Sequence, residues 1–206
     1  MKKLFFIAMV LMAACTMSLD KKADSLIKEE MKKTLFHPES YDPIETIVDS
    51  AFAPDDNPAL FEKIAKIMQI GSEMESLEDE ASNYRSTISI FSGPYVSEFG
   101  KNQKAEAQSK LDKTNAEIER QTSKAQKVGD EIKSMLSSDK KFIGFKANHS
   151  YRAKNNMGNV LMGRSIFIID EPLEKIIFSC NSEEYEQIQE AIEMIKERIA
   201  EKEKQE

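Results

Sequence analysis

The middle of the chain carries two stretches with heptad-spaced apolar residues, and they constrain the fold more than any other feature. Residues at this spacing share one side of a helix and pack well against a second helix. In residues 58–86 the series is Leu60, Ile64, Ile67, Gly71, Met74, Glu78 and Ala81. In residues 101–141 it is Leu111, Ile118, Ala125 and Ile132, with Thr114, Gln121, Val128 and Met135 at the companion positions.

The charges of the two stretches are complementary, since the first is rich in acids and the second in bases. We therefore predict an antiparallel helical hairpin over residues 58–138, with arms roughly 40–50 Å long at about 1.5 Å per residue. A single long helix is the alternative, but an isolated arm would lose the packing on which most helix stability depends.

The segment between the arms, residues 87–102, combines helix breakers with apolar side chains. Gly93, Pro94 and Gly100 interrupt a helix, while the apolar residues include Phe91, Tyr95 and Phe99. Such side chains cap the hairpin on themselves, fold back on the body, or meet a partner. Phe91, Tyr95 and Phe99 are the candidate partner-binding residues.

The segments that flank the hairpin predict a small α+β body. Residues 20–36 place Ala23, Ile27, Met31 and Leu35 on one side of a helix that stops before Pro38. β-Branched residues favour a strand at residues 44–52, and Pro58 is suited to the first turn of the next helix.

After residue 139 the pattern becomes that of a sheet. Residues 143–153 alternate between apolar and polar, and the Asn- and Gly-rich residues 155–159 predict a hairpin turn. Residues 160–170 and 174–180 supply two more strands of a meander. A final amphipathic helix begins near Asn181, with Glu184 in position for a capping box.

We expect an α+β fold in which the N- and C-terminal helices cover a small antiparallel sheet and the long hairpin is inserted between strands. The expected division is a signal peptide at residues 1–14, an acylated N-terminus with the first helix and strand at 15–57, the hairpin at 58–138, and the meander with its helix at 139–206.

The N-terminus has the parts of an export signal. Lys2 and Lys3 precede an apolar run that ends at Ala14, before Cys15, and this run is too short to span a bilayer core of about 30 Å. We expect cleavage before Cys15 and lipid attachment to its thiol. The alternative is an ordinary signal peptide in which Cys15 takes no part.

Charge and composition argue against several functions. The net charge of −7 repels nucleic acid and anionic head groups at long range, so no nucleic-acid partner is expected. Cys180 is the one other cysteine, which leaves no pair for an internal disulfide after lipidation of Cys15. We expect no cofactor and no metal, because no zinc-type or nucleophile motif occurs.

A polar group near the end of the first meander strand is the candidate ligand site: His149, Tyr151, Arg152 and Asn155. An arginine beside an asparagine suits an anion or the carboxylate of a carbohydrate. The competing interpretation is structural: His149 is a hydrogen-bonded core residue, and Arg152 and Asn155 fix the turn after the strand.

Three short segments carry a family resemblance. Residues 11–15 (LMAAC) resemble a bacterial lipobox, from which only Met12 departs. Residues 35–41 (LFHPESY) and 149–158 (HSYRAKNNMG) are similar to segments of small uncharacterised lipoproteins of Bacteroidota. The resemblance implies a compact α+β domain on a lipid anchor, without a known activity.

These observations together predict an exported lipoprotein anchored to the cell envelope, at the outer membrane, facing the periplasm or the cell surface. We expect it to bind or scaffold an envelope protein, without catalysis. The alternative is a module that binds a small molecule or a glycan around residues 149–155.

Overall fold

The structure, a computed structural model, describes residues 19–203 and within them confirms the predicted α+β class. The predictions for residues 1–14 and for Cys15 lie outside the described residues. The described chain divides into two compact units, of which the first holds residues 19–58 and 139–190 and the second holds residues 59–138 and 191–203. The packing thus groups the last turns of the C-terminal helix with the hairpin, whereas the sequence placed residues 139–206 in one body.

The first unit is built on a four-stranded antiparallel sheet with the strand order β1-β2-β3-β4. Its strands are β1 (Asp42–Ala53), β2 (Lys141–Lys154), β3 (Val160–Asp170) and β4 (Ile176–Asn181). The predicted meander is therefore present, and β1 pairs with its first strand from Asp42 opposite Arg152 to Ala53 opposite Lys141. Because the ends of β1 and β2 meet at Ala53 and Lys141, the hairpin is an insertion between two neighbouring strands.

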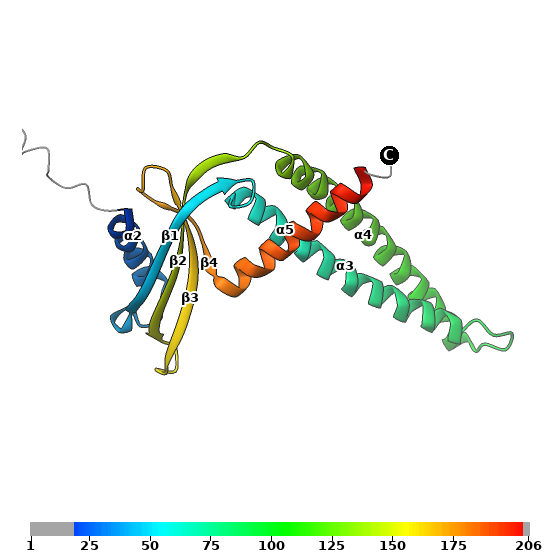
Figure 1. Cartoon of the computed structure of the whole chain (residues 1–206). Helices are drawn as coiled ribbons and strands as arrows, with labels where there is room; N and C mark the ends of the chain where they lie inside the picture. Colours follow the sequence, from blue (N-terminus) through cyan, green and yellow to red (C-terminus); the bar gives the residue numbers. More distant parts are fainter. Residues whose placement is uncertain (1–18, 204–206) are drawn as a thin grey trace, which may run out of the picture. The chain divides into compact units, whose positions relative to one another are not determined.

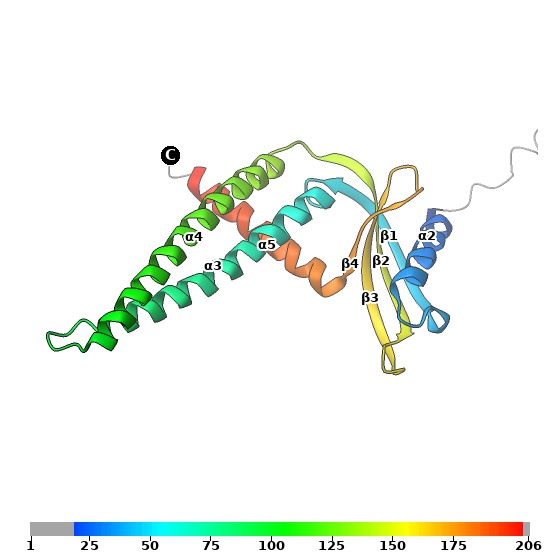
Figure 2. The ribbon, with the colours of Figure 1, turned by 180° about the vertical axis from the view of Figure 1, so that it is seen from behind.

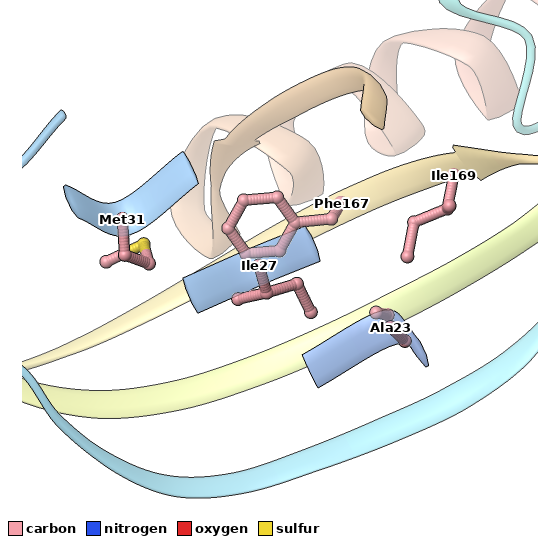
Figure 3. Packing of buried hydrophobic residues seen from close by; sticks show 6 residues of the cluster. Ala23, Ile27, Met31, Phe167 and Ile169 are labelled. Carbon is pink, nitrogen blue, oxygen red and sulfur yellow. The ribbon is translucent and has the colours of Figure 1, made fainter. Parts of the chain in front are cut away.

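One face of the sheet is covered by α2 (Leu19–Thr34), as Figure 1 shows. The predicted four-residue spacing buries Ala23, Ile27 and Met31 completely or nearly so. These side chains pack on Ala147, Phe167 and Ile169 of the two central strands (Figure 3). A short 3₁₀ turn, η2 (Pro38–Ser40), then leads into β1. The apolar stripe of α2 therefore forms the core of this unit with the sheet.

The opposite face of the sheet meets the start of α5 (Ser182–Glu203) through a polar contact. The Asp56 carboxylate, buried after β1, accepts hydrogen bonds from Lys146 Nζ at 2.8 Å and from the Tyr185 hydroxyl at 3.0 Å. The Asn181 side chain accepts a hydrogen bond from the backbone N–H of Glu184 at 2.7 Å, which confirms the predicted start of this helix.

The second unit contains the predicted helical hairpin, formed by α3 (Pro58–Ile90) and α4 (Glu98–Leu136) (Figure 2). Lys63 forms an ion pair with Glu131, and Gln121 Nε2 donates to the Glu73 carboxylate at 3.0 Å. From Lys63 to Glu73 the chain advances ten residues along α3, and the contacted residues on α4 step back by the same ten, from Glu131 to Gln121. The two arms are therefore antiparallel in one constant register between these two contacts.

The predicted seam of α4 faces inward along its length. Leu111, Thr114, Gln121, Val128 and Ile132 are buried, and the other predicted members, Ile118, Ala125 and Met135, are half-buried. The seam predicted for α3 is wrong at two places: Ile70 is buried where Gly71 was expected, and Leu77 is half-buried while Glu78 is exposed. A helix has 3.6 residues per turn, so the apolar neighbour one position away can turn inward and leave a glycine or a carboxylate in water.

Candidate functional site

The tip of the hairpin is closed by two apolar side chains that pack on Gly100. Ser97 caps α4 and accepts a hydrogen bond from the backbone N–H of Gly100 at 3.3 Å. A Cβ atom at position 100 would lie 2.5 Å from Val96 Cγ1 and 2.9 Å from Phe91 Cδ1, so a larger residue would displace these two side chains. Phe91 is half-buried, and its ring packs against Gly100 at the start of α4.

The remaining large apolar residues of the tip point into water. The exposed fractions are 99% for Tyr95, 67% for Phe99 and 74% for Ile90. We call these three residues the tip patch. Of the three candidate partner-binding residues, Tyr95 and Phe99 belong to it, whereas Phe91 is turned inward. Ile90 was not among the candidates. It could have been one, because the sequence already shows an apolar residue next to the predicted turn.

His149 is placed at the centre of the first unit, with 1% of its surface exposed. Hydrogen bonds join its Nε2 to the Tyr41 hydroxyl at 2.8 Å and its Nδ1 to the Thr46 hydroxyl at 2.9 Å. The Tyr151 ring stacks on the imidazole, with centroids 5.7 Å apart and planes 10° apart. Both ring nitrogens are thus engaged, which agrees with a hydrogen-bonded core residue.

The electrostatics of this cluster favour neutral groups. Burial lowers the pKa of His149, and the charge of Asp24 and a hydrogen bond with the backbone of Glu45 oppose that effect. Burial also raises the pKa of Tyr41 to about 12. A neutral imidazole between two hydroxyl groups is a stable arrangement in a site that is short of water.

Arg152 and Asn155 do not join His149. Successive residues of a strand face opposite sides of the sheet, so Arg152 lies on the other face from Tyr151, 3.8 Å from the Asp42 carboxylate. The Asn155 side chain accepts hydrogen bonds from the backbone N–H groups of Met157 and Asn159, both at 3.0 Å, and so holds the β2–β3 turn. The four candidate ligand residues are therefore divided between a core cluster, an exposed face and a turn.

A cleft of about 270 Å³ opens beside the His149 cluster. Its lining includes Asp24 and Lys28 of α2 together with Tyr41 and Thr46. The last two are the hydrogen-bond partners of His149, and sequence reasoning missed them because they lie more than a hundred residues away in the chain. Glu45 also lines the cleft, so a small polar molecule there would meet two hydroxyl-bearing residues, two acidic residues and one lysine.

Within residues 19–203, no group of three or more histidine, cysteine or acidic side chains is arranged to hold a metal ion. Burial raises the pKa of the Cys180 thiol to about 12, so this cysteine stays protonated near neutral pH and is a poor nucleophile. Among the described helices, none has the length and apolar character needed to cross a membrane.

Comparison with models of protein families, with curated proteins and with solved structures gave no match for this chain.

Proposed function

We infer that this chain is a lipid-anchored envelope protein that binds or scaffolds another envelope protein through the tip patch. The observation that carries the proposal is the exposure of Tyr95, Phe99 and Ile90 at the end of a hairpin whose interior is already closed by Phe91. Burying each such side chain is worth about 1.5–3 kcal/mol, and Tyr is a residue type favoured at binding hot spots. Each of these three side chains leaves at least two thirds of its surface exposed, so each buries little area within the hairpin itself.

The N-terminal residues support the anchor. The basic start, the apolar run and Cys15 fit a lipoprotein signal, and acyl chains on Cys15 would hold the protein to the membrane, with the outer membrane as the proposed location. Replacement by Cys15→Ser is expected to abolish labelling by a palmitate analogue and to release the chain from the membrane fraction. A Cys15→Ser protein that stays labelled and membrane-bound would contradict the anchor.

The binding role is tested by photo-crosslinking in cells from a reactive residue at position 95. A matched control carries the same residue at position 124, where Lys124 is exposed on α4 away from the tip. We expect a discrete adduct from position 95 only, and its loss in a Phe99→Ser background. If position 95 gives no adduct, or the same adducts as position 124, the tip is not a binding surface.

A second candidate function rests on the cleft beside His149, whose polar lining suits a small molecule or the end of a glycan. Its volume of about 270 Å³ is close to the lower limit of about 300 Å³ for ligand pockets, so the ligand would be small. A ligand there would raise the melting temperature of the unaltered protein, and Tyr41→Phe would weaken that shift by removing one hydroxyl group. Substitutions in the tip patch would leave it unchanged, which separates this function from the first.

A further inference from the structure

The end of the β2–β3 hairpin exposes a second set of large apolar side chains. Met157, Val160, Leu161 and Met162 each leave between 55% and 80% of their surface in contact with solvent. Further along the same strand, by contrast, Ile166 to Ile169 are all buried. We call residues 152–164 the β-finger. Its turn is visible at the lower end of the sheet in Figure 1.

The exposed apolar residues cover both faces of the β-finger. Val160 pairs with Lys154, Leu161 with Ala153, and Met162 with Arg152. Paired residues share a face and neighbours along a strand alternate, so Leu161 lies on one face and Val160 and Met162 lie on the other.

The turn itself is held firmly. Gly158 adopts a φ of +81°, which favours glycine, and the Asn155 side chain binds two backbone N–H groups of the turn. The backbone of Met157 is therefore held in the turn, and the β-finger is an ordered element with an apolar end.

The charges of the β-finger differ from those of the whole chain. Residues 152–164 contain Arg152, Lys154 and Arg164 and no carboxylate, in a protein of net charge −7. Two of these cations stand directly opposite the exposed Met162 and Val160. Asp42 lies near Arg152, Glu39 lies near Lys154, and Asp49 and Glu186 line one cavity with Arg164. The local charge is therefore moderate, and the apolar end is the larger part of the signal.

We propose that the β-finger inserts into the interfacial region of a phospholipid bilayer that contains anionic lipid. A flat protein surface could cover only one face of the β-finger, whereas lipid surrounds an inserted element on both. Long cationic side chains beside the apolar end would reach the phosphate groups while their stems stay among the acyl chains. This contact is separate from the tip patch and from the acyl chains proposed for Cys15.

The chain contains no tryptophan, so one substitution creates a unique fluorescent reporter. The probe is the full chain with Leu161→Trp, mixed with vesicles of phosphatidylcholine alone or with about one third phosphatidylglycerol, each made with and without brominated acyl chains. The matched control is Met68→Trp, at an exposed position of α3 in the second unit. Because both variants keep the same N-terminal residues, a tether there affects them equally.

With phosphatidylglycerol present, the Leu161→Trp variant is expected to show a blue-shifted emission and to lose most of its intensity to brominated lipid. The Met68→Trp control is expected to keep its intensity. Replacing Arg152, Lys154 and Arg164 by Gln in the Leu161→Trp variant should remove the difference between the two lipid mixtures.

Leu161→Trp emission that is unaffected by both vesicle types would overturn the proposal, as would quenching equal to that of Met68→Trp. Quenching that remains dependent on phosphatidylglycerol after the three Gln substitutions would overturn the role of the cations. Far-UV circular dichroism checks that each variant is folded, which is expected because the substituted side chains are exposed.

Discussion

At the scale of single residues, His149 shows how a buried titratable group is made compatible with an apolar core. Each ring nitrogen faces a hydroxyl group, from Tyr41 or Thr46, and a hydroxyl can either donate or accept a hydrogen bond. The neutral imidazole is therefore satisfied in either tautomer. The protonated ring has to carry a charge in a site that is largely closed to water, and this is the reason that its pKa is lowered.

The first prediction concerns the pH dependence of stability. In the unfolded chain His149 titrates near its usual pKa of about 6.5, and in the folded chain its pKa is lower. Between these two values the unfolded state binds more protons, so the free energy of unfolding falls as the pH drops through about 6.5 and keeps falling until the folded pKa is reached.

Thermal melts between pH 7.5 and pH 5 measure this effect, with His149→Asn as the comparison. We expect the variant to melt at a lower temperature at neutral pH, because it loses packing against Tyr151, but to show a smaller decrease in melting temperature with acid. Asp24, which faces the cluster, is retained in both proteins. Parallel pH profiles for the two proteins would contradict the assignment.

The second prediction concerns Gly163 of β3, which pairs directly with Tyr151 of the neighbouring strand β2. A Cβ atom at this position would lie 2.5 Å from Tyr151 Cζ, so Gly163→Ala must displace the ring from its stack on His149. We expect a loss of about 1–3 kcal/mol in the free energy of unfolding, as for other overpacked cores. In a Tyr151→Ser background the same alanine should cost much less, and denaturant titration of the four proteins checks this; equal costs would show that the ring is not the obstacle.

At the scale of elements, periodicity in the sequence was sufficient to predict α2, the meander and the seam of α4. These patterns work because each element buries one face against a single neighbour, so a local repeat records the packing. Long-range contacts leave no such record. Neither Tyr41 nor Thr46 could be assigned to His149, since both come from a connection and a strand far away in the chain.

One feature of the candidate sites could have been predicted from the sequence alone, and another could not. Strand alternation already separates Arg152 from His149 and Tyr151, so these residues could not line one surface of the sheet. By contrast, nothing in the sequence could distinguish Phe91 from Tyr95 or Phe99. The choice of which ring packs on Gly100 depends on the path of the loop, and this is set by three-dimensional packing.

The third prediction follows from the corrected seam of α3. Gly71 is exposed in the middle of this helix, and a Cβ atom there would have no neighbouring atom within 4 Å. Gly71→Ala should therefore stabilise the hairpin by about 0.5–1 kcal/mol, because alanine loses less backbone entropy than glycine and meets no clash. A higher midpoint of denaturation in the variant checks this; a lower midpoint would mean that position 71 packs in the seam after all.

At the scale of the whole molecule, the chain passes through the hairpin between two strands that are direct neighbours. Ala53 and Lys141 are paired at the end of β1 and β2, so the insertion leaves and re-enters the sheet at one point. The core on the α2 face of the sheet, from Ala23 and Ile27 to Phe167 and Ile169, contains no residue of the hairpin. The Asp56 contacts with Lys146 and Tyr185 also lie entirely within the first unit.

The fourth prediction is that the first unit folds without the hairpin. The test protein joins Pro58 to Asp139 through a short Gly-Ser linker and ends after Glu190, which removes the second unit and leaves the α2 core and the Asp56 contacts intact. We expect a cooperative thermal transition and the circular dichroism of a sheet with less helix. Ile27→Ala provides the control, because deleting a fully buried isoleucine side chain costs about 2–5 kcal/mol. If the unit is independent, this cost is the same in the full chain and in the shortened one; a non-cooperative melt, or a cost that disappears on shortening, would show that the sheet depends on the hairpin for its folded state.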